Sequence, residues 1–99
     1  DQTKIVLNDI SLDIESRAVT KNGQKIELPK KEYEILCLLA SSPGKIFSRE
    51  EIYAKIWGSS VYVSDRTLDV HIRKLRKNIG EKNIKTSKGY GYGISLNEE

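Results

Sequence analysis

The sequence predicts an α+β fold in which an N-terminal antiparallel sheet is followed by three helices and a C-terminal β-hairpin. Apolar and polar residues alternate near both ends of the chain, as they do in half-buried strands. Between these parts, apolar residues recur at helical spacing and are interrupted by glycine-containing breaks. A chain of 99 residues has room for one core. We therefore expect one domain over 1–99, with the sheet at 4–28, the three-helix core at 30–80 and the hairpin at 84–96.

The N-terminal sheet is predicted to have three or four strands. Its alternating apolar residues are Ile5 and Leu7, and then Ile10, Leu12 and Ile14. Asn22-Gly23 separates two further short segments, and this pair is preferred in a type I′ turn because both positions need positive φ. The sheet is therefore antiparallel and built from hairpins.

Three helices are predicted to follow the sheet. The first runs from Lys30 to about Ser42, where Pro43-Gly44 stops it. Ser48 opens the second, because Glu51 three residues later completes a capping box, and Gly58 closes it. Ser64 or Asp65 caps the third, which runs to Ile79.

The third predicted helix has two contrasting faces. At 100° per residue, one narrow stripe is apolar and must face the core; it holds Leu68, Ile72, Leu75 and Ile79. The opposite face carries four cations and no acid around one small aliphatic residue, namely Arg66, Arg73, Lys74 and Lys77 around Val70. On one shoulder of the helix, Asp69 is spaced to pair with Arg73.

The C-terminal hairpin is predicted to turn at Ser87-Lys88-Gly89, with Lys88 near its tip. The period of two is expected to put these residues on one face of the hairpin: Ile84, Thr86, Tyr90, Tyr92, Ile94 and Leu96. Gly91 and Gly93 fall on the other face.

Charge distribution indicates a polyanionic partner for the C-terminal third. Residues 1–65 hold nine basic and ten acidic side chains, whereas residues 66–99 hold eight basic and four acidic ones. A cationic helix fits the major groove of duplex DNA, and a cation at a hairpin turn fits the neighbouring minor groove. The alternative is a solvated charged face, but such faces normally mix both signs. Helix, loop, helix and hairpin in this order form a winged helix-turn-helix.

At this point the sequence resembles a known family, the winged-helix effector domains of OmpR/PhoB-type bacterial two-component response regulators. The resemblance rests on LPKKEYEILCLLASSPGKIFSREEIYAKIWG at 28–58, VYVSDRTLDVHIRKLRK at 61–77 and TSKGYGY at 86–92. It implies sequence-specific binding of duplex DNA for transcription regulation, with the third helix in the major groove and the hairpin, or wing, in the minor groove.

The resemblance also implies which residues touch DNA. On the third helix they are Arg66, Thr67, Val70, His71, Arg73, Lys74 and Arg76, with Val70, Arg73 and Lys74 nearest the bases. Trp57 matches a position near the phosphate backbone, although we favour a packing role for it, with any DNA contact made through its indole N–H. On the wing they are Thr86, Lys88 and Tyr92. The charge pattern adds Lys77 as a phosphate contact.

Further partners follow from the resemblance alone. It implies that two copies pair head-to-tail on a direct repeat, that the isolated domain is monomeric, and that the N-terminal sheet faces a receiver domain absent here. It also implies that one loop contacts RNA polymerase or its sigma factor. This loop consists of Gly58, Ser59, Ser60, Val61, Tyr62, Val63 and Ser64.

The sequence departs from the family pattern in the wing. Lys88 stands where the family usually has an arginine, and a strongly hydrated ammonium suits a narrow groove less well, so we expect a weaker wing contact. Ser87 and Gly93 stand where larger residues are common. We therefore expect a more mobile wing.

Other function classes find little support in the sequence. One cysteine and one histidine exclude an internal disulfide and the common metal sites, and we expect no cofactor and no enzymatic activity. Cys37 is expected in the core, and His71 lacks a catalytic partner. No apolar run reaches the length of a membrane span, so we expect a cytoplasmic protein. The alternative function is a winged helix that binds protein or RNA.

Overall fold

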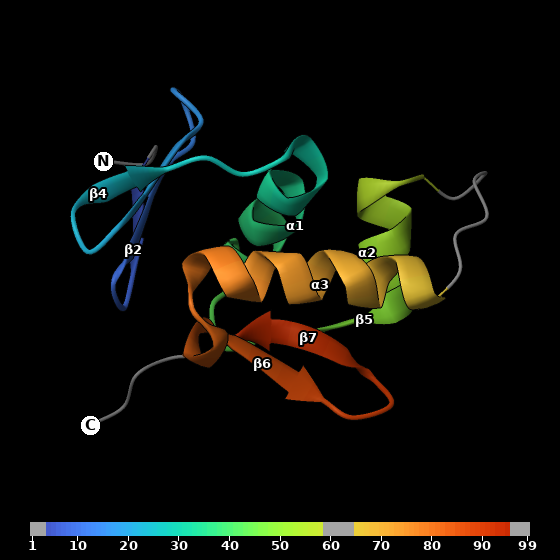
Figure 1. The fold of residues 1–99 in the computed structure, drawn as a ribbon. Coiled ribbons are helices and arrows are strands. Elements are labelled where there is room, and N and C mark those ends of the chain that lie inside the picture. The colour runs from blue at the N-terminus through green and yellow to red at the C-terminus, as the bar shows by residue number, and fades with distance from the viewer. Residues whose placement is uncertain (1–3, 59–64, 96–99) are drawn as a thin grey trace.

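The computed structural model describes residues 4–58 and 65–95, and it has the predicted α+β architecture (Figure 1). The N-terminal strands are β1 Lys4–Leu7, β2 Ile10–Asp13, β3 Ala18–Lys21 and β4 Gln24–Ile26. The middle of the chain forms α1 Lys30–Ala40, β5 Ile46–Ser48, α2 Arg49–Ile56 and α3 Asp65–Ile79. The last described elements are the short 3₁₀ helix η1 Glu81–Asn83 and the strands β6 Ile84–Ser87 and β7 Gly91–Ile94.

The N-terminal sheet is a four-stranded antiparallel meander in the order β1-β2-β3-β4, as predicted. Asn22 and Gly23 have φ values of 52° and 82°, so the predicted hairpin turn forms between β3 and β4. Leu12 and Val19 face each other across β2 and β3 and are buried. Ile14 was expected to continue this buried face, but it lies in the turn after β2 and is 40% exposed.

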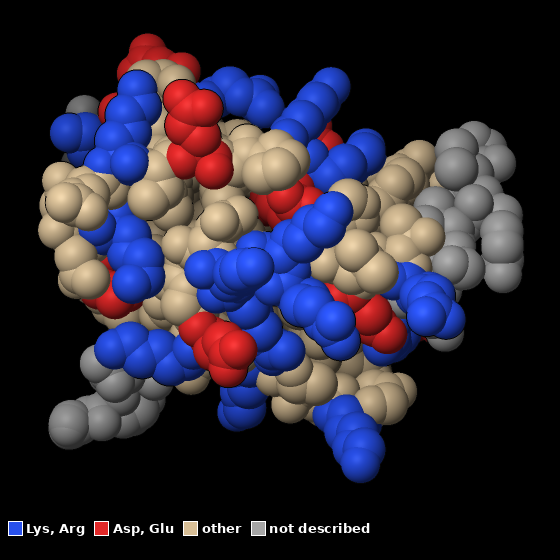
Figure 2. All heavy atoms as spheres, viewed as in Figure 1, with Lys and Arg blue, Asp and Glu red and all other residues tan. Residues whose placement is uncertain are grey.

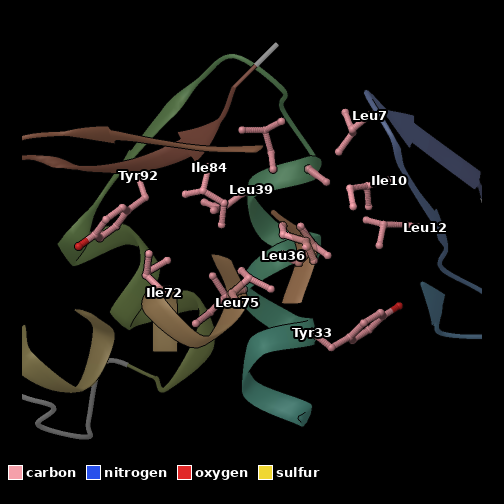
Figure 3. Packing of buried hydrophobic residues seen from close by; sticks show 14 of the residues in the cluster. Leu7, Ile10, Leu12, Tyr33, Leu36, Leu39, Ile72, Leu75, Ile84 and Tyr92 are labelled. Carbon is pink, nitrogen blue, oxygen red and sulfur yellow. The ribbon is translucent and has the colours of Figure 1, made fainter. Parts of the chain in front are cut away.

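Helix α1 lies at the centre of the core. Figure 3 shows Leu36 of α1 between Leu12 of the N-terminal sheet and Leu75 of α3. The predicted apolar stripe of α3 is confirmed, because none of its four side chains is more than 1% exposed. Helix α1 ends at Ala40, with Ser41 as its C-cap, slightly earlier than predicted. The packing of α3 on α1 is what turns the opposite face of α3 outward.

Helix α2 begins with the predicted capping box. The Ser48 hydroxyl accepts a hydrogen bond of 3.1 Å from the Glu51 backbone N–H, and the Glu51 carboxylate accepts one of 3.0 Å from the Ser48 N–H. Gly58 follows the helix with a φ of 93°, a conformation that glycine adopts without strain. The remainder of the predicted polymerase-contact loop, 59–64, lies outside the described residues.

The C-terminal hairpin belongs to a larger sheet than predicted. Strand β5 pairs with β7, which gives a three-stranded antiparallel sheet in the order β5-β7-β6. The turn falls at 88–90, so Tyr90 lies in it, 53% exposed, and does not continue the predicted face of the strand. The predicted wing residue Leu96 lies outside the described residues.

Gly93 has a packing role in this sheet. A Cβ atom placed on Gly93 would lie 2.2 Å from the backbone oxygen of Lys45, and one on Gly91 would lie 1.8 Å from that of Phe47. Both glycines are therefore required by the close approach of the chain around β5. Gly93 therefore allows the chain to pack closely here, in addition to any effect that it has on the mobility of the wing.

Candidate nucleic-acid interface

The outward face of α3 carries the predicted cations. The side chains of Arg66, Arg73, Lys74 and Lys77 are all exposed. Val70, in the middle of this face, is 43% exposed. Figure 2 shows Lys and Arg side chains gathering over α3 in the middle of this view, with a few acidic side chains among them. The face therefore offers positive charge and one aliphatic contact on a rigid helix, which is what a major groove accepts.

Asp69 does not have its predicted partner. Its Oδ1 accepts a hydrogen bond of 2.8 Å from Arg49 Nη2, at the start of α2, and one of 2.6 Å from the Tyr92 hydroxyl on β7. Arg49, and not Arg73, is therefore the cation that pairs with Asp69 among the described residues. The guanidinium of Arg73 stays on the exposed face.

These contacts shift the pKa values of Asp69 and Tyr92. Burial acts to raise the pKa of Asp69, but the hydrogen bonds from Tyr92 and Arg49, together with the charge of Arg49, hold it below its ordinary value. Burial, and then the hydrogen bond to the Asp69 carboxylate, raise the pKa of Tyr92. Asp69 is thus ionised and Tyr92 is a neutral donor at neutral pH.

Arg76 attaches α3 to the wing. Its Nη2 donates a hydrogen bond of 3.1 Å to the backbone oxygen of Ile84 and another to Thr86 Oγ1. Its guanidinium also lies 5.9 Å from the centre of the Tyr92 ring. The predicted contact residues Arg76, Thr86 and Tyr92 are therefore held against one another, and Tyr92 is only 6% exposed.

A hollow lies between α3 and the wing. Its volume is about 380 Å³, and its lining residues are Asp69, Ile72, Arg73, Arg76, Glu81 and Tyr92. Lys88 is exposed in the wing turn, as predicted. The hollow therefore lies between the cationic face of α3 and the wing that carries Lys88. The contacts of Asp69 and Arg76 fix the position of the wing relative to α3.

Trp57 and His71 lie together on another side of α3. The two rings are 5.6 Å apart, and Lys31 Nζ lies 5.5 Å from the centre of the Trp57 ring. Trp57 packs against the core and is partly buried, which confirms its packing role. His71 Nδ1 lies 2.6 Å from Oε2 of Glu32, a residue of α1.

Sequence reasoning missed two residues of this interface, Glu32 and Arg49. Glu32 had a local signal, because an acid four residues before Leu36 falls on the apolar face of α1. Arg49 had none, since its position depends on the pairing of β5 with β7, and its backbone N–H donates to the oxygen of Tyr90 at 3.0 Å. Both residues position side chains of the predicted contact set.

Within 4–58 and 65–95, no group of three or more His, Cys, Asp or Glu side chains is arranged to hold a metal ion. None of the helices described is both long enough and apolar enough to cross a membrane.

Comparisons with known proteins show which sequences and folds this chain resembles. Residues 23–94 match the family described as "Transcriptional regulatory protein, C terminal". The phosphate regulon transcriptional regulatory protein PhoB of Rhizobium meliloti is 38% identical over an alignment of 96 residues, and the match covers 93% of this chain and 42% of PhoB. The chain thus spans about two fifths of that relative.

Solved structures agree in fold. The response regulator DrrB of Thermotoga maritima, an OmpR/PhoB homolog, has a TM-score of 0.86 and 35% identity, over 94% of this chain and 44% of DrrB. The DNA-binding domain of Klebsiella pneumoniae RstA, solved in complex with the RstA box, has a TM-score of 0.82 and 28% identity. That match covers 93% of this chain and 96% of the RstA domain.

Proposed function

We propose, because this chain belongs to the family of C-terminal domains of transcriptional regulatory proteins, that it binds duplex DNA sequence-specifically to regulate transcription. The observation that carries this proposal is the outward face of α3. It presents four exposed cations around Val70, while the acid at its edge, Asp69, is already paired with Arg49. The RstA domain, which has the same fold, was solved on its DNA box. Nucleic-acid binding and not catalysis is the activity of this domain.

Helix α3 enters the major groove in this proposal. Val70, Arg73 and Lys74 read base edges, because arginine reaches guanine with two hydrogen bonds and an aliphatic side chain contacts a thymine methyl. Arg66 and Lys77 neutralise phosphates on either side and set the register. The remaining proposed contacts of this region are Trp57, Thr67, His71 and Arg76.

The wing lies in the adjacent minor groove. Lys88 is exposed in the turn and is the cation that reaches the groove. Thr86 and Tyr92, which are joined to α3 through Arg76 and Asp69, set the angle between wing and helix and contact the backbone beside it. Because both elements are tied together, they approach the duplex as one rigid unit.

The remaining proposals concern the whole protein. The chain spans about two fifths of the length of its relative PhoB. We propose that it is the output domain of a two-component response regulator in the bacterial cytoplasm. The N-terminal sheet faces the receiver domain, and two copies bind head-to-tail to a direct repeat. Loop 58–64 contacts RNA polymerase or its sigma factor.

Enrichment from a randomised duplex DNA pool tests this function. The chain is immobilised at about physiological salt, and the bound duplexes are sequenced. We expect a short motif, repeated at about one helical turn, or 10–10.5 bp. An Arg73→Ala, Lys74→Ala double variant, which keeps the wing, is expected to lose the motif but to retain duplexes.

The salt dependence of binding separates the alternatives. A plot of log affinity against log salt is expected to have a slope of about −0.9 for each phosphate neutralised. Retention without enrichment would limit the activity to phosphate binding. A chain that retains no duplex even at low salt is a module for protein or RNA, and the proposed function would then be wrong.

A further inference from the structure

Glu32 is an unusual residue for a small core. It lies on α1 beneath α3, is 2% exposed, and is the one carboxylate among the described residues that is fully buried. Its Oε2 lies 2.6 Å from His71 Nδ1, while its Oε1 has no hydrogen-bond partner among the described residues. Burying a polar group costs free energy unless it is hydrogen-bonded, so this carboxylate depends on its contact with His71. The same contact fixes the orientation of the His71 ring.

His71 reaches from this buried carboxylate to the proposed DNA face. Its side chain is 24% exposed, although Nδ1 is directed into the core. The outer part of the residue lines a hollow of about 270 Å³ together with Arg66, Thr67 and Val70. Arg66 and Val70 belong to the cationic face of α3, so a phosphate of a duplex bound there would approach the imidazole ring.

The chemistry of the two partners fixes the proton on Nδ1. An ionised carboxylate only accepts hydrogen bonds, so Nδ1 must be the donor to Glu32. In the neutral ring Nε2 is then an acceptor, and phosphate oxygens are acceptors too. His71 therefore donates to a phosphate only after Nε2 has taken up a proton. The charged groups shown beside the ring are Glu32 and Arg66, while Lys31 Nζ lies over the neighbouring Trp57 ring.

We propose that Glu32 is a positioning residue that holds His71 ready to bind a DNA phosphate as an imidazolium, so that DNA binding takes up a proton. An opposite charge beside the ring favours its charged form, so an arriving phosphate promotes the uptake of this proton. This inference rests on the proposed function, since the phosphate belongs to the bound duplex. It makes DNA affinity depend on pH in the range in which histidine titrates.

The test measures the affinity for the duplex recovered from the randomised pool at fixed ionic strength, between about pH 6 and about pH 8. We expect the wild-type chain to bind roughly five- to tenfold more tightly at the lower pH, because one proton is linked to binding. His71→Gln is expected to bind equally at both pH values. The chain has one histidine, so the difference between these two proteins isolates its contribution.

The matched variants on α1 test the role of Glu32. Glu32→Gln keeps an acceptor for Nδ1 but removes the charge, so it is expected to lose most of the pH dependence while His71 keeps its Nδ1–H tautomer by NMR. Glu34→Gln removes a charge from the same helix, where Glu34 pairs with Lys31 at 3.7 Å, and is expected to behave as wild type. Circular dichroism of each variant checks that the fold is retained.

Each other outcome overturns a definite part of the inference. Wild-type DNA binding that does not change with pH would overturn the linkage and leave the proposed function standing. An unchanged pH profile in Glu32→Gln would overturn the role of Glu32. A wild-type chain that binds no duplex at either pH would overturn the proposed function itself.

Discussion

The hydroxyl of Tyr92 donates a hydrogen bond of 2.6 Å to Oδ1 of Asp69, and this bond joins the wing to α3. The same oxygen accepts from Arg49, so the start of α2 is attached at the same point. Three elements that come together only through the tertiary fold thus share one carboxylate oxygen. The angle between the two proposed DNA-binding elements depends on this contact.

Tyr92→Phe tests the contact between wing and helix. The ring stays buried, so we expect the free energy of unfolding in urea to fall by only about 1 kcal/mol, the usual contribution of one hydrogen bond. DNA affinity, measured by fluorescence anisotropy, is expected to fall because the wing is no longer held at a fixed angle. Tyr90→Phe, in the wing turn, is the control. Equal affinities in the two variants would contradict this role of Tyr92.

Asp69 is expected to make stability depend on pH in the acid range. Its pKa is lowered in the folded chain, so the ionised carboxylate stabilises the fold above the ordinary value of about 3.9. This contribution is lost as the pH falls through the folded pKa. The difference in unfolding free energy between wild type and Asp69→Asn should therefore be largest at neutral pH and shrink below about pH 4. A difference that grows on acidification would have the wrong sign.

Arg73→Ala is expected to remove one element of base recognition. The loss of binding free energy for the preferred duplex should be about 1–3 kcal/mol, and the preference at one base position should relax. Competition with single-base variants of the duplex measures this. If every base preference persists in the variant, Arg73 does not read a base.

Lys77→Ala is expected to behave differently, because its exposed ammonium is assigned to a phosphate. All duplexes should lose affinity alike, and the slope against log salt should fall by about 1. A salt titration with the preferred duplex and a scrambled one measures both effects. A loss confined to the preferred duplex would show that Lys77 takes part in base recognition.

Gly93→Ala is expected to destabilise the domain, since its Cβ would meet the Lys45 oxygen at 2.2 Å. Overpacking of this kind costs about 1–3 kcal/mol, and denaturation in urea should show it. Lys85→Ala changes the residue that faces Gly93 across β6 and β7, and it should cost little because Lys85 is exposed. Equal stability of the two variants would mean that the chain around β5 relaxes.

Local patterns predicted most of the fold correctly. The stripe from Leu68 to Ile79, the Ser48 capping box and the Asn22-Gly23 turn each depend on residues within a few positions of one another. Strand β5 could not be predicted in this way, because three residues show no clear alternation and pair with a distant strand. Tyr90 was wrongly placed in a strand, because residue types predicted a turn at 87–89 and the turn lies at 88–90.

The candidate site was predictable only in part for the same reason. The cationic face of α3 follows from helical periodicity, and its side chains are exposed as expected. The partners of Asp69 and His71 come from other elements, and periodicity along α3 carries no information about them. An i, i+4 spacing allows an Asp69–Arg73 pair. In the fold, however, Asp69 accepts hydrogen bonds from Arg49 and Tyr92.

The position of β7 in the middle of its sheet has a consequence for synthesis on the ribosome. The N-terminal meander pairs only neighbouring strands, so it has all its partners as soon as β4 emerges. Strand β5 emerges before α2 and α3 but has no partner until β7 leaves the exit tunnel. Throughout that interval the edge of β5 is unpaired. The step most exposed to misfolding is therefore the arrival of a few late residues, and chains that stall before Tyr92 should be targets for chaperones and proteases.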